Sequence, residues 1–181
     1  MKTSRRRWPL IAVLLSLTAT ATLLAQVKVT PVVSQDGRVL ASFSAPAAFS
    51  GEADHIMKSG LLLTFTFTVQ LRKPSALWFD PTLAETTVGS SVKYDSLTGS
   101  YQLTKQHDGR IVASERRMRA AGVIEWMTTF DQVPLVCEQP LERNADYYVS
   151  VKLRTSPRPW FSVWSWGRDD GAGRGGFTFI R

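Results

Sequence analysis

One stretch decides the fold class: residues 61–72 read Leu-Leu-Leu-Thr-Phe-Thr-Phe-Thr-Val-Gln-Leu-Arg. Apolar side chains occupy every odd position from Leu61 to Leu71, while the even positions from Thr64 to Gln70 are polar. A period of two predicts a β-strand with one buried face and one wet face. Because strands of parallel sheets are buried on both faces, this alternation favours an antiparallel sheet.

Shorter strands separated by turn signals lie on both sides of this stretch. The dipeptide Asp36-Gly37 is the preferred type I′ hairpin turn and joins two strand-like runs. A polar turn containing Gly99 separates two tyrosine-containing runs in the same way. We expect about eight strands, at residues 27–33, 38–44, 61–72, 84–94, 101–105, 147–153, 160–166 and 177–180.

This pattern predicts a mostly β fold, an antiparallel β-sandwich of the immunoglobulin-like kind with one or two short helices. One helix is expected at residues 51–59, with Ser50 as its N-cap. Helical spacing returns between residues 120 and 132, and Pro134 is expected to end that helix. The four glycines between Asp169 and Phe177 predict a loop before the last strand.

The N-terminal residues have the pattern of an export signal. Three arginines, Arg5 to Arg7, precede an apolar run, and small residues follow. Cleavage after Ala21 and cleavage after Ala25 both remain open, and the uncharged stretch is just long enough for an anchor helix. We therefore expect residues 1–25 to be a signal peptide or an N-terminal anchor. Residues 26–181 would then form a single β-sandwich domain that is periplasmic or secreted, or held at the inner membrane facing the periplasm.

Most of the excess positive charge belongs to this leader. The chain has 22 basic and 15 acidic residues, and four of the basic residues, but no acidic one, lie in residues 1–25. The remainder has 18 basic residues against 15 acidic ones. Such a balance is typical of an ordinary solvated surface and argues against nucleic acid as a partner.

The sequence offers little catalytic chemistry. Cys137 is the single cysteine, and His55 and His107 are the two histidines. These counts exclude zinc sites of four cysteines, of two cysteines and two histidines, or of three histidines, and a histidine–carboxylate site would need both histidines or one with distant acids. No Gly-x-Ser-x-Gly elbow, His-Glu-x-x-His helix or Walker loop occurs. The adjacent residues Asp169 and Asp170 point apart in an extended chain and are poor partners for acid–base catalysis. We therefore expect no enzyme activity, no metal and no cofactor.

Aromatic residues form the one pattern in this sequence that suggests a ligand-binding surface. Trp160, Trp164 and Trp166 fall on one face of an expected strand by the period of two. Together with Trp78 they are candidates for binding an apolar ligand or a glycan. The alternative is that these rings fill the core.

Three places in the chain resemble a known family. The long strand ends in Leu71-Arg72-Lys73-Pro74 with Trp78-Phe79-Asp80 beyond it, Val92-Lys93-Tyr94-Asp95-Ser96-Leu97-Thr98 is followed by Tyr101, and Val133-Pro134-Leu135 precedes the strand at 147–153. In these features and their order, essentially the whole exported chain is similar to the bacterial envelope family catalogued as domain of unknown function 4390. The resemblance implies a signal sequence and a compact envelope domain, and it supplies no catalytic residues.

These features predict an exported envelope protein that acts as a non-enzymatic interaction or structural module. Its partner would be an envelope protein or a membrane-associated protein. The alternative function is a binding or carrier domain for an apolar ligand or a glycan, which would use the aromatic strand. The two hypotheses differ in one feature, because ligand binding needs an open groove lined by the tryptophans.

Overall fold

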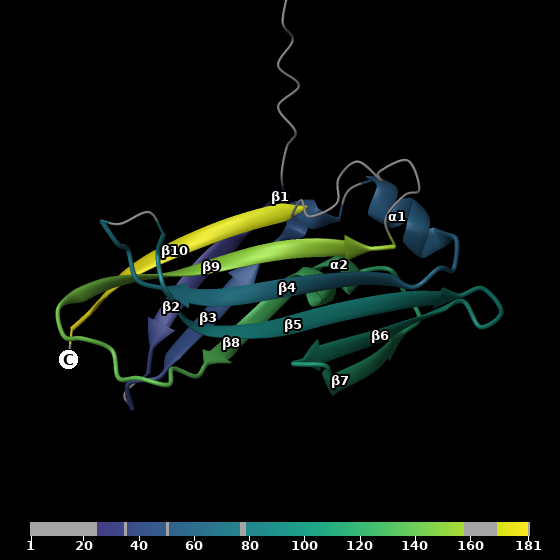
Figure 1. Ribbon diagram of the computed structural model, residues 1–181. Coiled ribbons are helices and arrows are strands. Elements are labelled where there is room, and N and C mark those ends of the chain that lie inside the picture. Colours follow the sequence, from purple (N-terminus) through teal and green to yellow (C-terminus); the bar gives the residue numbers. More distant parts are fainter. Residues whose placement is uncertain (1–24, 35, 50, 77–78, 158–169, 181) are drawn as a thin grey trace, which may run out of the picture.

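The computed structural model of the protein describes residues 25–34, 36–49, 51–76, 79–157 and 170–180 (Figure 1). The predicted signal peptide or anchor helix, apart from Ala25, lies outside these residues, and so do Ser50 and the predicted strand at 160–166. Within the described residues, no helix is both long enough and apolar enough to span a bilayer.

The described residues form two sheets. The larger sheet has the strand order β1-β10-β9-β4-β5-β6-β7, and the smaller sheet has the order β2-β3-β8. All neighbours are antiparallel except β1 and β10, which form a short parallel pair. The prediction of a mostly β fold with antiparallel sheets is confirmed. The strands are β1 (Ala25–Gln26), β2 (Lys28–Val33), β3 (Val39–Ser44), β4 (Leu63–Arg72), β5 (Thr82–Asp95), β6 (Ser100–His107), β7 (Arg110–Arg117), β8 (Thr129–Leu135), β9 (Ala145–Ser156) and β10 (Gly171–Phe179).

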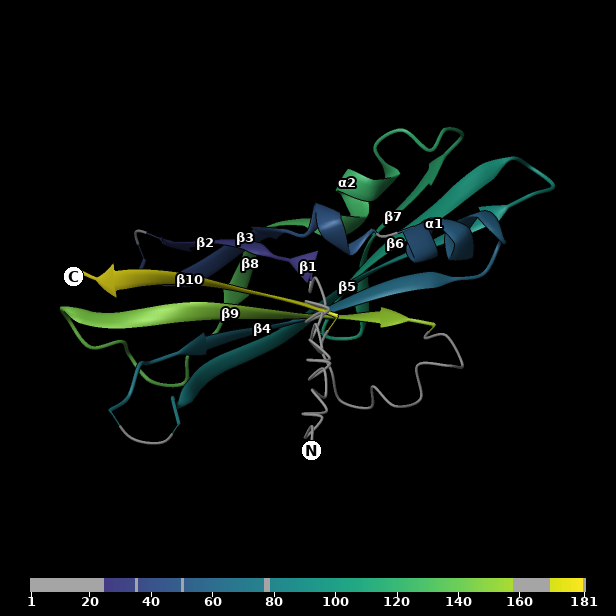
Figure 2. The ribbon, with the colours of Figure 1, turned by 90° about the horizontal axis from the view of Figure 1, so that it is seen from above.

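The two sheets stack face to face, and two short helices extend the cover. Figure 2 shows β2, β3 and β8 above β10, β9 and β4, with α1 (Gly51–Lys58) and α2 (Val123–Thr128) farther along the same side. A single 3-10 turn, η1 (Pro46–Ala48), precedes α1. An immunoglobulin-like domain divides its strands into sheets of four and three, so the described division into seven and three departs from that arrangement. The cause is the run from β4 to β7, in which each strand pairs with the next.

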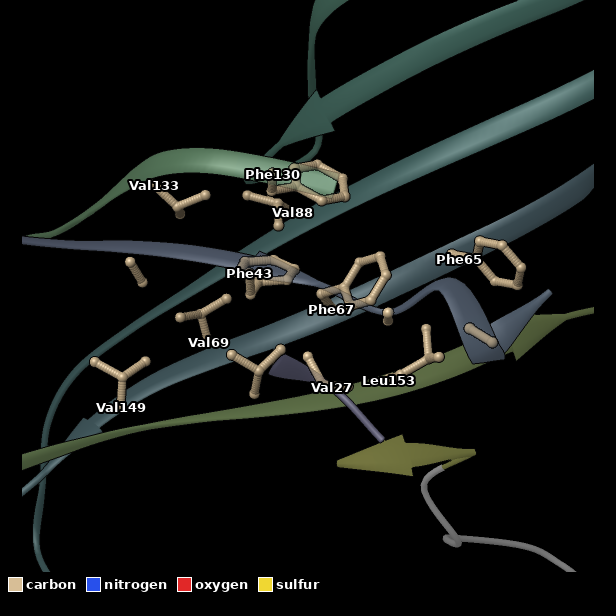
Figure 3. Packing of buried hydrophobic residues seen from close by; sticks show 14 of the residues in the cluster. Val27, Phe43, Phe65, Phe67, Val69, Val88, Phe130, Val133, Val149 and Leu153 are labelled. Atoms are coloured by element: carbon tan, nitrogen blue, oxygen red, sulfur yellow. The ribbon is translucent and has the colours of Figure 1, made fainter. Parts of the chain in front are cut away.

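The buried face of β4 is the centre of the core. Its odd-numbered side chains have no exposed surface, whereas the threonines on its other face are partly exposed, so the alternation predicted both faces correctly from Leu63 onward. Leu61, which was expected on the buried face, precedes the strand and is 55% exposed. Phe67 of β4 meets Phe43 of β3 and Phe130 of β8 between the sheets (Figure 3). The ring centroids of Phe43 and Phe130 lie 5.1 Å and 5.2 Å from that of Phe67. Burial of each ring contributes about 1.5–3 kcal/mol, so this trio is a main link between the layers.

The expected helix at residues 120–132 is wrong in its extent, because α2 is followed at once by β8. The helical spacing comes from Val123, Met127 and Phe130, which are all buried, although Phe130 belongs to the strand. Packing of this ring between the sheets therefore overrides the local helical pattern. Pro134 does not end a helix but lies within β8, an edge strand, where its missing N–H is tolerated.

The glycine-rich segment is a strand and not the predicted loop. β10 begins at Gly171 and pairs with β9 along its length. A Cβ on Gly173 would lie 2.0 Å from the carbonyl oxygen of Val27, and one on Gly175 would lie 2.7 Å from that of Val29. The absence of side chains thus lets the chain that enters β2 pack directly on the backbone of β10, a close approach that glycine in a strand often marks.

Candidate functional site

The tryptophans predicted to bind a ligand, Trp78, Trp160, Trp164 and Trp166, all lie outside the described residues. So does Asp169, the first residue of the discounted Asp169-Asp170 pair. Within the described part of the chain, no three His, Cys, Asp or Glu side chains are close enough to hold a metal ion. The candidate site must therefore be sought in other features of the described surface.

The strand β7 is the most exposed element of the larger sheet. It lies at one edge and pairs only with β6 (Figure 1). Every side chain from Arg110 to Arg116 is exposed, and because successive side chains point to opposite faces, both faces of the strand are open. Its free edge presents backbone N–H and C=O groups onto which another extended chain can add.

Both edge strands of the smaller sheet are protected by a proline. Pro31 lies in β2 and Pro134 in β8, the two edge strands of the smaller sheet. A proline has no N–H and prevents a further strand from completing a ladder. At the opposite edge of the larger sheet, β1 covers only Gly171 and Ala172, and the rest of β10 has β9 as its single partner strand among the described residues. β7 contains no proline and has no covering strand among the described residues.

Positive charge is concentrated on β7 and the turn that follows it. Residues 110–119 contain four arginines and one glutamate, a net charge of +3. The whole range 26–181 has 18 basic and 15 acidic residues, so the rest of that range is neutral overall. Arg117 pairs with Glu115 at 2.7 Å. The other three arginines form no ion pair with a described residue: Arg110, Arg116 and Arg119.

Exposed apolar side chains lie between these arginines. The register of β6 and β7 shifts between Lys105 and Gln106, which leaves Val112 as the extra residue of a β-bulge next to Ile111. Ile111 is 67% exposed and Val112 is 62% exposed. Bulges at sheet edges commonly re-aim side chains in this way. Met118, just after the strand, adds a third exposed apolar side chain.

A hydrogen-bonded series of three side chains fixes the turn from which β7 starts. The Oγ1 atom of Thr86 lies 2.9 Å from Nε2 of His107 and donates to the carboxylate of Asp108 at 3.0 Å. Because the hydroxyl has one proton, which goes to the carboxylate, His107 is the donor on the other side. In a catalytic triad the hydroxyl donates to the histidine, so the direction here is the reverse. The backbone N–H of Thr87, followed by the Thr86 hydroxyl, lowers the pKa of Asp108.

A half-buried lysine holds β6 against the smaller sheet. The Nζ atom of Lys105 donates to the carbonyl oxygen of Thr129 at 2.7 Å and lies 4.5 Å from the ring centre of Phe130 and 5.0 Å from that of Trp126. Burial lowers the pKa of Lys105. The carbonyl and the ring faces compensate for the lost hydration of the ammonium group. These contacts join β6 to α2 and to β8 of the smaller sheet, while β7 itself stays open.

A pocket of about 800 Å³ lies where the β2–β3 turn meets the segment after β8. Its lining includes apolar residues of the core margin, Val39, Leu135 and Phe179, together with the exposed residue Arg143. Cys137 also lines it, and burial raises the pKa of this thiol, which makes it a weaker nucleophile at neutral pH. The volume is in the range of small-molecule sites.

On the outer face of the larger sheet, Tyr148 fastens the loop between β4 and β5. Its hydroxyl donates to Oδ2 of Asp80 at 2.6 Å, and the guanidinium of Arg174 lies 3.4 Å from the centre of its ring. Asp80 also accepts a hydrogen bond from the backbone N–H of Ser75 at 2.8 Å. The Tyr148 bond first, and then the Ser75 bond, lower the pKa of Asp80. These contacts position the loop and leave no reactive group unsatisfied.

The described residues thus define a protein of two stacked antiparallel sheets with an open, cationic edge at β7. Comparison with protein-family models matches residues 24–158 to the family described as domain of unknown function (DUF4390). The chain belongs to this family, as the resemblance in the sequence predicted. The match ends just after β9, so β10 lies outside it and the expected coverage of the whole exported chain is too wide. Comparisons with curated proteins and with solved structures give no match.

The sequence contains one feature that points to the open edge, although the predictions made from the sequence did not use it. Ile111-Val112-Ala113 follows a turn signal in the sequence, but it was not among the predicted strands. Four arginines within ten residues, next to two β-branched apolar residues, are the feature that could have drawn attention to it.

Proposed function

We propose that this protein is an exported, non-enzymatic protein of the bacterial cell envelope that acts as an interaction module through β7. The observation that carries this proposal is the exposure of both faces and the free edge of a complete strand. Open edges are a liability because they pair with other chains, and proteins usually protect them. An edge that stays unprotected while Pro31 and Pro134 guard the smaller sheet is best explained by a partner that covers it.

The proposed partner is another envelope protein or a membrane-associated protein. Nucleic acid is not proposed, because the chain after the leader is close to charge balance outside residues 110–119. Export is supported by the cationic, apolar and small-residue order of the first 25 residues. The protein would be periplasmic or secreted after cleavage, or anchored in the inner membrane with the sheets facing the periplasm.

Cell fractionation of a C-terminally tagged chain tests the location. We expect the tagged protein in the periplasmic, secreted or inner-membrane fraction, and its intact mass distinguishes cleavage from anchoring. A soluble cytoplasmic pool of full-length protein would contradict export.

Photo-crosslinking in living cells tests the interaction edge. A photoreactive amino acid is placed at Val112 and, as a matched control, at Val136, an equally apolar residue that is 83% exposed outside β7. We expect a discrete adduct with an envelope protein from position 112 and none from position 136. Equal adducts at both positions, or none at 112, would argue against β7 as the site.

The alternative, a carrier for an apolar ligand or a glycan, depends on tryptophans outside the described residues. The pocket beside Cys137 is the described feature that favours it. Tryptophan fluorescence titrated with glycans and lipids tests this function, and the absence of any saturable change would exclude it.

A further inference from the structure

We infer that β7 takes up an extended acidic segment of its partner, which adds to the larger sheet as a further strand. This inference rests on the proposed function, because it names the chemistry of the partner at the same edge. The free backbone groups of β7 supply the ladder. The side chains around that ladder select the segment.

The charge of β7 favours carboxylates on both faces of the incoming strand. Arg116 lies opposite Gln102 and Arg117 lies opposite Tyr101, so these consecutive arginines point to the two different faces of the sheet. Directly opposed unlike charges stabilise neighbouring strands, and like charges destabilise them. Because Arg110 and Arg116 form no ion pair among the described residues, both remain available to an acidic neighbour.

The apolar residues of β7 indicate how apolar and acidic residues follow one another along the partner's segment. Ile111 and Val112 lie beside Arg110 at one end, and Arg116 and Arg117 close the other end. A matching strand therefore carries apolar side chains where it passes the bulge and carboxylates near both of its ends. Apolar burial supplies affinity, and the flanking charges set the register and discriminate between partners.

Two other occupants fit the edge less well. In the antiparallel register that pairs the whole strand with a second copy of the chain, Arg110 would face Arg117, which is a repulsive pair. An anionic membrane surface would neutralise one face of the strand, but the arginines occupy both faces, and lipid headgroups cannot complete a backbone ladder.

Synthetic peptides of defined charge test the inference on the full-length chain in mild detergent. Three labelled peptides share a central pair of valines, which two consecutive glutamates, glutamines or lysines flank on each side, so that both faces of the strand carry the charge; fluorescence anisotropy measures their binding. We expect the acidic peptide to bind about tenfold or more tightly than the neutral one, with the basic one weakest, and this preference to shrink as salt rises. R116E should weaken acidic binding, whereas R143E, at an exposed arginine outside β7, should not.

Methylated peptides separate strand addition from simple charge attraction. Methylation of alternate amide nitrogens keeps the charge but removes the N–H groups along one edge of the peptide. We expect one methylation phase to abolish binding and the other to preserve it, because one edge of the added strand faces β7.

Three results would overturn the inference: equal binding of both methylated peptides and the unmodified one, failure of the acidic peptide to bind, or concentration-dependent crosslinking between two copies at position 112. Failure of the acidic peptide together with a specific adduct at 112 in cells would overturn only this inference. Loss of that adduct would overturn the proposed function itself.

Discussion

Gly173 and Val27 are in direct backbone contact: a Cβ on Gly173 would stand 2.0 Å from the carbonyl oxygen of Val27. Substitution G173A therefore forces β10 away from the segment that leads into β2. We expect a loss of about 3 kcal/mol or more in the free energy of unfolding, at the upper end of overpacking effects. Urea denaturation measures it. The control G176A lies in the same strand with its nearest atom 3.8 Å away and should change stability by less than about 0.5 kcal/mol; comparable losses in both variants would refute this account.

Phe67 has no exposed surface and touches an aromatic ring from each of two strands of the smaller sheet. Substitution F67A should leave a cavity between the layers and lower the free energy of unfolding by about 3–5 kcal/mol. The matched variant F79A removes a phenylalanine that is 78% exposed and should stay within about 0.5 kcal/mol of the parent. If F67A were as harmless as F79A, the ring would not lie between the sheets.

Substitution Y148F should raise the pKa of Asp80, because the phenol donates the hydrogen bond that contributes most to lowering it. A carboxyl group whose folded pKa is below its unfolded value contributes stability above the unfolded pKa, and this contribution is lost as the pH falls through the folded pKa. The variant should therefore be less stable than the parent at neutral pH, and the difference should vanish in acid. Carboxyl carbon NMR titration provides the measurement. Asp108 is an internal control whose lowered pKa should not move, because its partners are Thr87 and Thr86; a shift at both sites would indicate a general disturbance.

Cys137 should react slowly with thiol reagents in the folded protein, because burial raises its pKa and reduces the thiolate fraction. We expect labelling by Ellman's reagent at neutral pH to be about tenfold or more slower than in the urea-unfolded chain. Equal rates in the two states would mean that the thiol is freely accessible and that the pocket beside it is not closed on that side.

The sequence predicted those elements whose pattern is set by one buried face. In β4, every second side chain is buried, so the alternation around Phe65 and Phe67 identified the strand and showed which of its faces is buried. Met127 and Phe130 misled because both are buried at a helical spacing, although the chain changes from helix to strand between them. The first part of β10 was read as a loop because Gly173 and Gly175 were counted as turn residues, whereas their spacing of two places both on one face of a strand. Its end was predicted as the strand at 177–180.

The candidate site was less predictable for a different reason. A short apolar run at Ile111 follows a turn signal in the sequence, but it was not predicted as a strand. Its place at an edge depends on which strands pair over long distances, and no local pattern contains that information. The tryptophan hypothesis stays untested, because Trp78 and the three tryptophans after Arg158 lie outside the described residues.

The parallel pairing of Ala25 and Gln26 with Gly171 and Ala172 joins segments from the two ends of the described chain. Contacts so distant in sequence form late, since a very long loop must close first. The segment that leads into β2 packs on the backbone of β10. A nascent polypeptide that stops before β10 therefore lacks this contact and cannot form the complete fold.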